Sequence, residues 1–258
     1  MVPRVKRGGA RGGIVKNMWK CFGASVRGKG HIRAGIPNQD SFRISNLKWG
    51  DVAVVSDGVG SCPHAAEGSF AACKAIVYEA KKYHKNKEGI NAFLSNAHKI
   101  WAGCISPFKP NESSATCLFA IRPNGESILA GMLGDGMISV LKTDGSYAEL
   151  VEDKDGYFSN QTAALSESTQ PCQWKTLLLP SSECRAILLC TDGVADDIDP
   201  DKKLGFIRHI YTQARKCAPP STASKELRKM LKNWPVPKHS DDKTLVCLYK
   251  SGKNDEEE

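Results

Sequence analysis

Residues 51–58 read Asp-Val-Ala-Val-Val-Ser-Asp-Gly. The apolar run at 52–55 predicts a short buried strand, and the Asp-Gly pair behind it is typical of a turn. The same arrangement, an apolar run that ends in Asp-Gly, recurs at Asp135 and at Asp192. Buried strands that end in carboxylates can bring those carboxylates together at one edge of a sheet.

Other acidic residues divide into turns and candidates. Asp144 and Asp155 also precede glycine, but their neighbours are polar, so both are interpreted as ordinary turns. Asp40 and the pair Asp241-Asp242, directly before the last predicted strand, join the candidates. If these carboxylates converge, their mutual repulsion requires cations, and hard divalent ions with oxygen ligands are suited to the task.

The hydrophobic pattern predicts an α+β fold. A helix at 64–83 would place Phe70, Cys73, Ile76, Val77 and Ala80 on one face, and a second helix is predicted at 90–104. Further helices are predicted at 202–214 and 224–231. The predicted strands lie in a β-rich stretch at 21–42 and at 51–56, 116–121, 127–133, 137–141, 177–179, 186–190 and 244–249. Strands that follow one another without helical crossovers favour antiparallel pairing over a doubly wound sheet.

Length and composition fit one soluble domain. The chain has 258 residues, and neither a long Pro/Ser-rich linker nor an internal repeat divides it. No apolar run reaches the length of a membrane span, and the N-terminus lacks the apolar core of a secretory signal, so a cytoplasmic protein without membrane contact is expected. The ten cysteines form no CxxC pair, which favours free thiols over a zinc finger.

Charge is concentrated near the N-terminus. The chain carries 36 basic and 28 acidic residues, and six of the basic ones lie within residues 1–20. We expect a flexible basic leader at 1–18, a domain at 19–250 and an acidic tail at 251–258. The leader could contact nucleic acid or a membrane, or be merely solvated. It has no aromatic residue to stack on bases, so nucleic-acid binding is not expected.

Six short motifs occur in an order that resembles the metal-dependent serine/threonine protein phosphatases of the PPM (type 2C) family, in particular its bacterial members. They are Asn38-Gln39-Asp40-Ser41, Ser56-Asp57-Gly58-Val59-Gly60, Ser113-Ser114-Ala115-Thr116, Leu133-Gly134-Asp135-Gly136, Cys190-Thr191-Asp192-Gly193 and Asp241-Asp242-Lys243-Thr244. The resemblance implies a four-layer α-β-β-α sandwich, in which helix pairs flank two mainly antiparallel sheets.

The resemblance also assigns roles to single residues. Asp57 corresponds to the carboxylate that bridges two Mn²⁺ or Mg²⁺ ions, and the carbonyl of Gly58 helps to hold the second ion. Asp192 and Asp241 correspond to the other ligands of the first ion, and Asp135, together with Asp192, to the ligands of a weaker third ion.

Three further residues are candidates for the same site. Asp40 corresponds to an outer residue that orients metal-bound water, and Arg33 to the arginine that binds phosphate. Asp242 occupies the family's Asn position, where it is either a further metal ligand or only an added negative charge. A lysine at position 33 would bind phosphate less well than Arg33, because only a guanidinium makes paired hydrogen bonds to phosphate oxygens.

The implied reaction is hydrolysis of phosphoserine and phosphothreonine in proteins by a metal-activated water, without a phosphoenzyme intermediate. Two bridged cations lower the pKa of the shared water and stabilise the displacement at phosphorus. The expected partner is a phosphoprotein in signalling, either a kinase or a kinase target, and the expected state is a monomer.

Two departures from the family pattern keep an alternative open. Gln39 replaces a Glu that contacts the second ion, and Val59 replaces a His proposed as general acid. His31 and His64 are the nearest substitutes for that histidine, and His31 is retained as a catalytic candidate. The alternative is a catalytically silent module that binds phosphoproteins or regulates a partner kinase.

Overall fold

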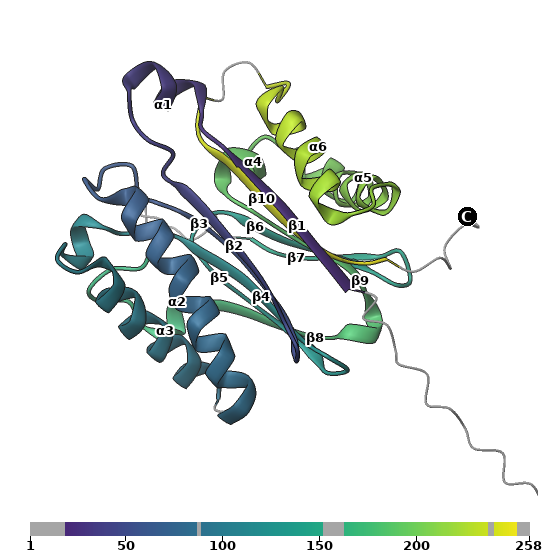
Figure 1. The fold of residues 1–258 in the computed structure, drawn as a ribbon, viewed down its shortest axis with the longest axis horizontal. Helices are drawn as coiled ribbons and strands as arrows, with labels where there is room; N and C mark the ends of the chain where they lie inside the picture. The colour runs from purple at the N-terminus through teal and green to yellow at the C-terminus, as the bar shows by residue number, and fades with distance from the viewer. Residues whose placement is uncertain (1–18, 87–88, 152–162, 237–239, 252–258) are drawn as a thin grey trace, which may run out of the picture.

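The computed structural model describes residues 19–86, 89–151, 163–236 and 240–251, with side chains of 84–86 excepted. Two five-stranded sheets stack face to face, with helices on both outer faces (Figure 1). The predicted α+β fold with antiparallel sheets is confirmed, because every pairing of neighbouring strands is antiparallel. The predicted leader, most of the acidic tail and Asp155 lie outside the described residues.

The strands divide between the sheets according to their place in the chain. The first sheet has the order β1-β10-β9-β6-β7. Its strands are β1 (Trp19–Val26), β10 (Lys243–Lys250), β9 (Cys184–Cys190), β6 (Met137–Lys142) and β7 (Tyr147–Leu150). The second sheet has the order β2-β3-β4-β5-β8. Its strands are β2 (Asp40–Leu47), β3 (Gly50–Asp57), β4 (Cys117–Pro123), β5 (Ser127–Leu133) and β8 (Lys175–Pro180).

Helices cover each sheet in pairs. α2 (Ala65–Asn86) and α3 (Ile90–Ile105) cover the second sheet, whereas α5 (Lys203–Lys216) and α6 (Pro220–Lys232) cover the first (Figure 1). Two short helices, α1 (Lys29–Ala34) and α4 (Asp192–Ala195), lie at the strand ends. None of the helices in the described residues is long and apolar enough to span a bilayer.

The middle of strand β3, residues 52–55, is apolar because both of its faces are buried. Val52 and Val54 belong to the core beneath α2 and α3, whereas Ala53 and Val55 belong to the core between the two sheets. A third core lies between the first sheet and α5 with α6. Three cores separate four layers, so a strand at the centre of the sandwich has no polar face.

Three expectations need correction. The stretch 21–42 is not continuous β structure, because α1 interrupts it between Gly28 and a left-handed Gly35 with φ 71°. Phe70 is 58% exposed, so it does not share the buried face of α2 with Cys73 and its neighbours. The cysteines of the described residues are free thiols, as expected, but Cys172 is exposed rather than buried.

Candidate metal centre

Asp40 and Asp57 lie side by side at one end of the second sheet. Asp40 begins β2 and Asp57 ends β3, and the two are partners in the antiparallel register. The amide of Asp57 donates a hydrogen bond to Thr116 Oγ1 at 3.0 Å, and its carbonyl accepts one from the Thr116 amide at 2.7 Å. These bonds fix the end of β3 where its carboxylate emerges.

Three further carboxylates come from the first sheet or from the crossing to it. Asp192 is the first residue of α4, directly after β9, and Asp241 lies two residues before β10. Since β9 and β10 pair in one sheet, these two aspartates emerge from neighbouring strands. Asp135 lies where the chain passes from β5 in one sheet to β6 in the other.

A threonine joins the two sheets at this end. Thr191, at the end of β9, donates from Oγ1 to Asp40 Oδ2 at 2.8 Å, and the same oxygen accepts the Thr244 amide at 3.2 Å. Asp40 therefore accepts a hydrogen bond from a residue of the opposite sheet. Asp40 is buried, with 6% of its surface exposed. Its other oxygen, Oδ1, is buried and has no hydrogen-bond partner within the described residues.

The carboxylates lie close enough to perturb one another. Burial, followed by the charges of Asp40 and Asp192, raises the pKa of Asp57 well above its ordinary value, and Asp241 adds to this effect. Burial, followed by the charges of Asp135 and Asp241, raises the pKa of Asp192 to about 6. Asp57, Asp192 and Asp241, far apart in the sequence, thus influence one another electrostatically.

Asp40 is a further carboxylate with a perturbed pKa, which burial raises to about 7. Raised pKa values mean that neighbouring cationic side chains do not offset the negative charge. A buried oxygen without a partner and a group of carboxylates with unneutralised charge both suit hard divalent cations. The residues present therefore fit such ions.

Glycine follows two of these aspartates because the space leaves no room for a side chain. A Cβ at Gly58 would lie 2.2 Å from the Ala65 carbonyl oxygen, and one at Gly193 would lie 1.8 Å from the Asp242 carbonyl oxygen. Close backbone approach, rather than a hairpin turn, thus explains these two Asp-Gly pairs. At Asp144 the turn prediction is confirmed, because Gly145 has φ 81° and Asp144 Oδ1 accepts the Ser146 amide.

Asp242 is used differently from the other candidates. It is 1% exposed, and its two oxygens accept the amides of Gly28 at 2.7 Å and Gln39 at 2.6 Å. His31 Nδ1 lies 2.9 Å from Asp242 Oδ2, outside hydrogen-bonding geometry, and His31 Nε2 lies 4.0 Å from Asp241 Oδ1. One ligand atom from each of these three side chains falls within 4.8 Å of the others.

The side chains of the remaining candidates are not hydrogen-bonded or ion-paired to the carboxylates among the described residues. Arg33 is exposed on α1 and forms neither a hydrogen bond nor an ion pair within the part of the chain that is described. The ring of His64 stacks on Phe108 with centroids 3.6 Å apart. Gln39 contributes through its backbone, since its carbonyl accepts the Gly58 amide at 3.1 Å and the Ser69 hydroxyl at 2.6 Å.

Two features of the site were missed in the sequence. Thr191 lies in the motif Cys190-Thr191-Asp192-Gly193, but the sequence does not show that its hydroxyl donates a hydrogen bond to Asp40. The proximity of His31 to Asp242 joins residues 211 positions apart, and no periodicity connects them. Pairing of β1 with β10 brings these segments together.

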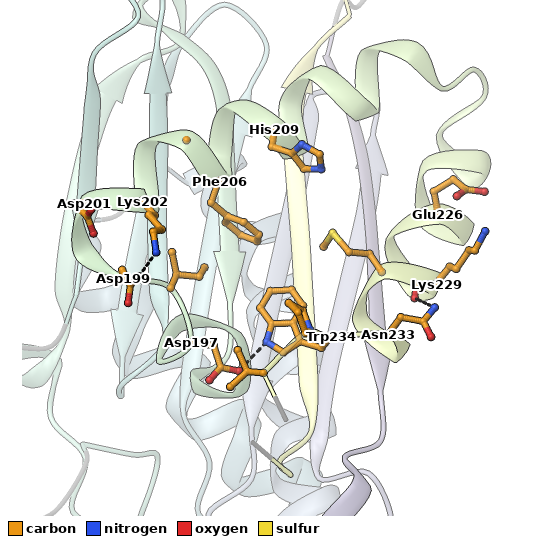
Figure 2. A pocket seen from close by; sticks show the side chains of 15 residues that line it. Asp197, Asp199, Asp201, Lys202, Phe206, His209, Glu226, Lys229, Asn233 and Trp234 are labelled. Carbon is orange, nitrogen blue, oxygen red and sulfur yellow. Dashed lines mark hydrogen bonds and ion pairs between the residues drawn. The ribbon is translucent and has the colours of Figure 1, made fainter. Parts of the chain in front are cut away.

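A large cavity lies between α5 and α6, away from the candidate residues (Figure 2). Its volume is about 920 Å³, and Phe206, Met230 and Trp234 line it. The indole Nε1 of Trp234 donates to Asp197 Oδ2 at 2.7 Å. None of the candidate site residues lines this cavity, so its size does not identify the centre of the chemistry.

Comparisons with known proteins identify the family and the fold. Residues 27–232 match the family model described as Protein phosphatase 2C. A comparison with the sequences of curated proteins finds no match. Among solved structures, RsbX in complex with magnesium is 17% identical, with a TM-score of 0.59 and coverage of 90% of this chain and 94% of RsbX.

Two other solved structures are similar to a comparable degree. The photosystem II phosphatase PBCP is 14% identical, with a TM-score of 0.62 and coverage of 91% of this chain and 100% of PBCP. A bacterial serine phosphatase is 16% identical, with a TM-score of 0.59 and coverage of 90% and 98%. At these identities the likeness shows the fold.

Proposed function

The chain belongs to the protein phosphatase 2C family, and from this premise we propose that it hydrolyses phosphoserine and phosphothreonine in proteins with the help of divalent cations. The observation that carries the proposal is the convergence of Asp57, Asp192 and Asp241 from both sheets, with the pKa of Asp57 and of Asp192 raised by burial and by neighbouring carboxylates. Divalent cations held by such a cluster would neutralise the charge of the dianionic ester.

Asp57, the Gly58 carbonyl, Asp192 and Asp241 would hold two Mn²⁺ or Mg²⁺ ions, and Asp135 with Asp192 would hold a weaker third. Bound cations supply Lewis-acid chemistry, which lowers the pKa of a water molecule and stabilises charge on the phosphoryl oxygens. Asp242 accepts the amides of Gly28 and Gln39, one on each oxygen, and its oxygens keep further lone pairs for a cation shared with Asp241.

The chain's own side chains orient the reactants. Asp40 is held by Thr191 and presents the free Oδ1 as an acceptor for an attacking water. Arg33 binds the phosphoryl oxygens through paired hydrogen bonds from its guanidinium. His31, beside Asp242, donates a proton to the leaving alkoxide. Water thus forms the new bond to phosphorus as the bond to the serine or threonine oxygen breaks.

A cysteine nucleophile is not favoured by the fold. Cys21 and Arg27 have the C-x5-R spacing of cysteine-dependent phosphatases, but Cys21 lies within the extended strand β1. It belongs to the core between the sheets, where burial raises the pKa of its thiol well above the ordinary value. A buried, protonated thiol is a poor nucleophile. This supports direct attack by water.

The test is turnover of p-nitrophenyl phosphate and of a phosphothreonine peptide by EDTA-treated protein, with and without Mn²⁺, from pH 6 to 9. We expect turnover only with the cation, and we expect Asp192→Asn to abolish it. Asp144→Asn, the same change in an exposed turn, should leave the rate unchanged. Absence of cation-dependent turnover across this range would contradict the proposal and favour the silent binding module.

A further inference from the structure

We propose that a basic groove beside Asp241 selects substrate segments with acidic side chains next to the phosphorylated residue; this rests on the proposed phosphatase function. The groove has a volume of about 470 Å³. It lies between the end of β1, helix α1, the end of α6 and the start of β10. Asp241, a candidate metal ligand, is part of its wall, so the groove begins at the candidate centre.

Positive charge dominates this groove. Five cationic side chains line it, against the single carboxylate of Asp241. They are Arg27, Lys29, Arg228, Lys232 and Lys243. They come from four separate elements, and no continuous run of basic residues in the sequence marks them. A surface with this charge balance attracts acidic peptide segments and repels basic ones.

The neighbouring cavity has the opposite charge balance. Trp234 and Val236 line both this groove and the larger cavity between α5 and α6 (Figure 2). The larger cavity, however, carries four carboxylates against two lysines. These carboxylates belong to Asp197, Asp199, Asp201 and Glu226. The charge changes sign across a shared apolar wall, so an acidic segment is directed to the side that holds Asp241.

Four of the five cations of the groove, all except the buried Lys243, have exposed side chains. Arg27 Nη2 donates to the His31 carbonyl at 2.8 Å, and Lys243 Nζ donates to the Asp241 carbonyl at 3.0 Å. Both bonds end on neutral carbonyl oxygens. Across the described ranges, none of the five cationic groups lies within 4.0 Å of a carboxylate oxygen. The charge of the four exposed cations, Arg27, Lys29, Arg228 and Lys232, remains available to a bound substrate.

The apolar lining strengthens this attraction. Ile32 is 57% exposed, an unusual degree for an isoleucine, and it stands in the groove with Leu231 and Val236. A peptide that covers Ile32 removes water from the cationic side chains nearby. Charges interact more strongly when water is excluded from between them. Acidic residues close to the phosphorylated residue would therefore gain most.

The test compares three phosphothreonine peptides that differ only in their flanking residues, which are Glu, Ala or Lys. We expect kcat/KM to be about tenfold higher with Glu than with Ala at low salt, and this difference to shrink in 0.5 M NaCl. Equal kcat/KM values for the Glu and Ala peptides would overturn the proposal.

Charge reversal localises the effect. Arg228 and Lys232 lie one turn apart on α6, so the double variant Arg228→Glu/Lys232→Glu balances the charge of the groove and should remove the preference for the Glu peptide. The control Lys74→Glu/Lys81→Glu makes the same charge change on exposed positions of α2 and should leave the order unchanged. Turnover of p-nitrophenyl phosphate should be unchanged in the control variant. If both double variants reduce the Glu preference equally, net charge explains it and the groove does not.

A binding measurement separates this proposal from the proposed function. Fluorescence anisotropy of the same labelled peptides with the full chain should give a lower Kd for the Glu peptide, and Arg228→Glu/Lys232→Glu should remove that difference. If all hydrolysis fails while this binding preference is present, the phosphatase function is wrong and the groove assignment stands. If hydrolysis is cation-dependent and the preference is absent, the groove assignment is wrong.

Discussion

Strand β3 has an aspartate near each of its ends, and the two carboxylates have opposite electrostatic surroundings. Near the start, Asp51 is 2% exposed and accepts hydrogen bonds from Arg122 Nε at 2.8 Å and Asn46 Nδ2 at 2.7 Å. At the far end, Asp57 faces Asp40 and Asp192, and its pKa is raised. One carboxylate is neutralised by a guanidinium, and the other is surrounded by carboxylates.

The two ends of β3 therefore differ in role, because Asp51 stabilises the fold and Asp57 is a candidate for binding cations. The pair of Asp51 and Arg122 is complete within the protein and links β3 to β4. The cluster around Asp57 is incomplete, because unneutralised buried charge opposes folding unless something binds to it. A chain that can supply an arginine to one end of a strand, and does not do so at the other, leaves that end suited to an external cation.

The largest expected effect concerns stability. Arg122→Ala would leave Asp51 buried without its cation, and breaking such a pair typically costs about 3–5 kcal/mol of unfolding free energy. Urea denaturation followed by circular dichroism measures this loss. The folded fraction should retain cation-dependent turnover, since Arg122 lies at the opposite end of β3 from Asp57. A loss of turnover without a loss of stability would contradict this division between the two ends.

The next effect compares one chemical change at both ends of β3. Asp57→Asn should reduce cation-dependent kcat/KM by more than about a hundredfold, beyond the usual effect of outer residues at metal sites. In EDTA it should not lower the melting temperature, because it removes repulsion. Asp51→Asn should lower the melting temperature and spare turnover. Equal destabilisation of the metal-free protein by Asp57→Asn and Asp51→Asn would contradict this difference between the two ends of β3.

A smaller effect is expected at the link between the sheets. Thr191→Val removes the hydroxyl that donates to Asp40 and keeps the shape of the side chain. We expect about a tenfold decrease in kcat or in Mn²⁺ affinity, as for other groups that orient a metal site. Thr176→Val, on the exposed face of strand β8, is the matched control and should have no effect. Equal rates for both variants would remove Thr191 from the site.

The smallest effect is a dependence of metal-free stability on pH. A folded-state pKa of about 7 at Asp40 means that the folded protein binds more protons than the unfolded chain between its ordinary value of 3.8 and about 7. This stabilisation is complete below the ordinary pKa and is lost as the pH rises through about 7.

In EDTA, the melting temperature should therefore fall by about 2–4 °C between pH 6 and pH 8 through Asp40 alone, and Asp40→Asn should make the slope smaller by this amount. Differential scanning calorimetry measures it. A melting temperature that rises over the same interval would contradict the raised pKa.

The sequence could predict the elements that carry the cluster, because apolar runs that end in Asp-Gly are local signals. The positions of Asp57 and Asp192 at strand ends and the antiparallel sheets followed from that pattern. Helix α1 could not be predicted, since its glycine-rich segment is held by Asp242, more than 200 residues away. The exposure of Phe70 was missed for a related reason, because periodicity does not show how far a helix is covered.

The differing use of the acidic residues also lay beyond the sequence. Asp241 and Asp242 are adjacent and identical in type, yet one is part of the carboxylate cluster and the other binds backbone amides. Their assignment depends on which way each side chain leaves the start of β10. The basic groove was likewise hidden, because its five cations come from separate elements.

Titration of metal-free protein with Mn²⁺ in a calorimeter at pH 8 tests the central claim, that Asp57, Asp192 and Asp241 together bind divalent cations. The wild-type chain should bind Mn²⁺ saturably, with more than one ion per chain, and Asp57→Asn/Asp192→Asn should lose this binding while Asp144→Asn keeps it. Equal Mn²⁺ binding by the wild type and the double variant, or no binding by either, would contradict the account.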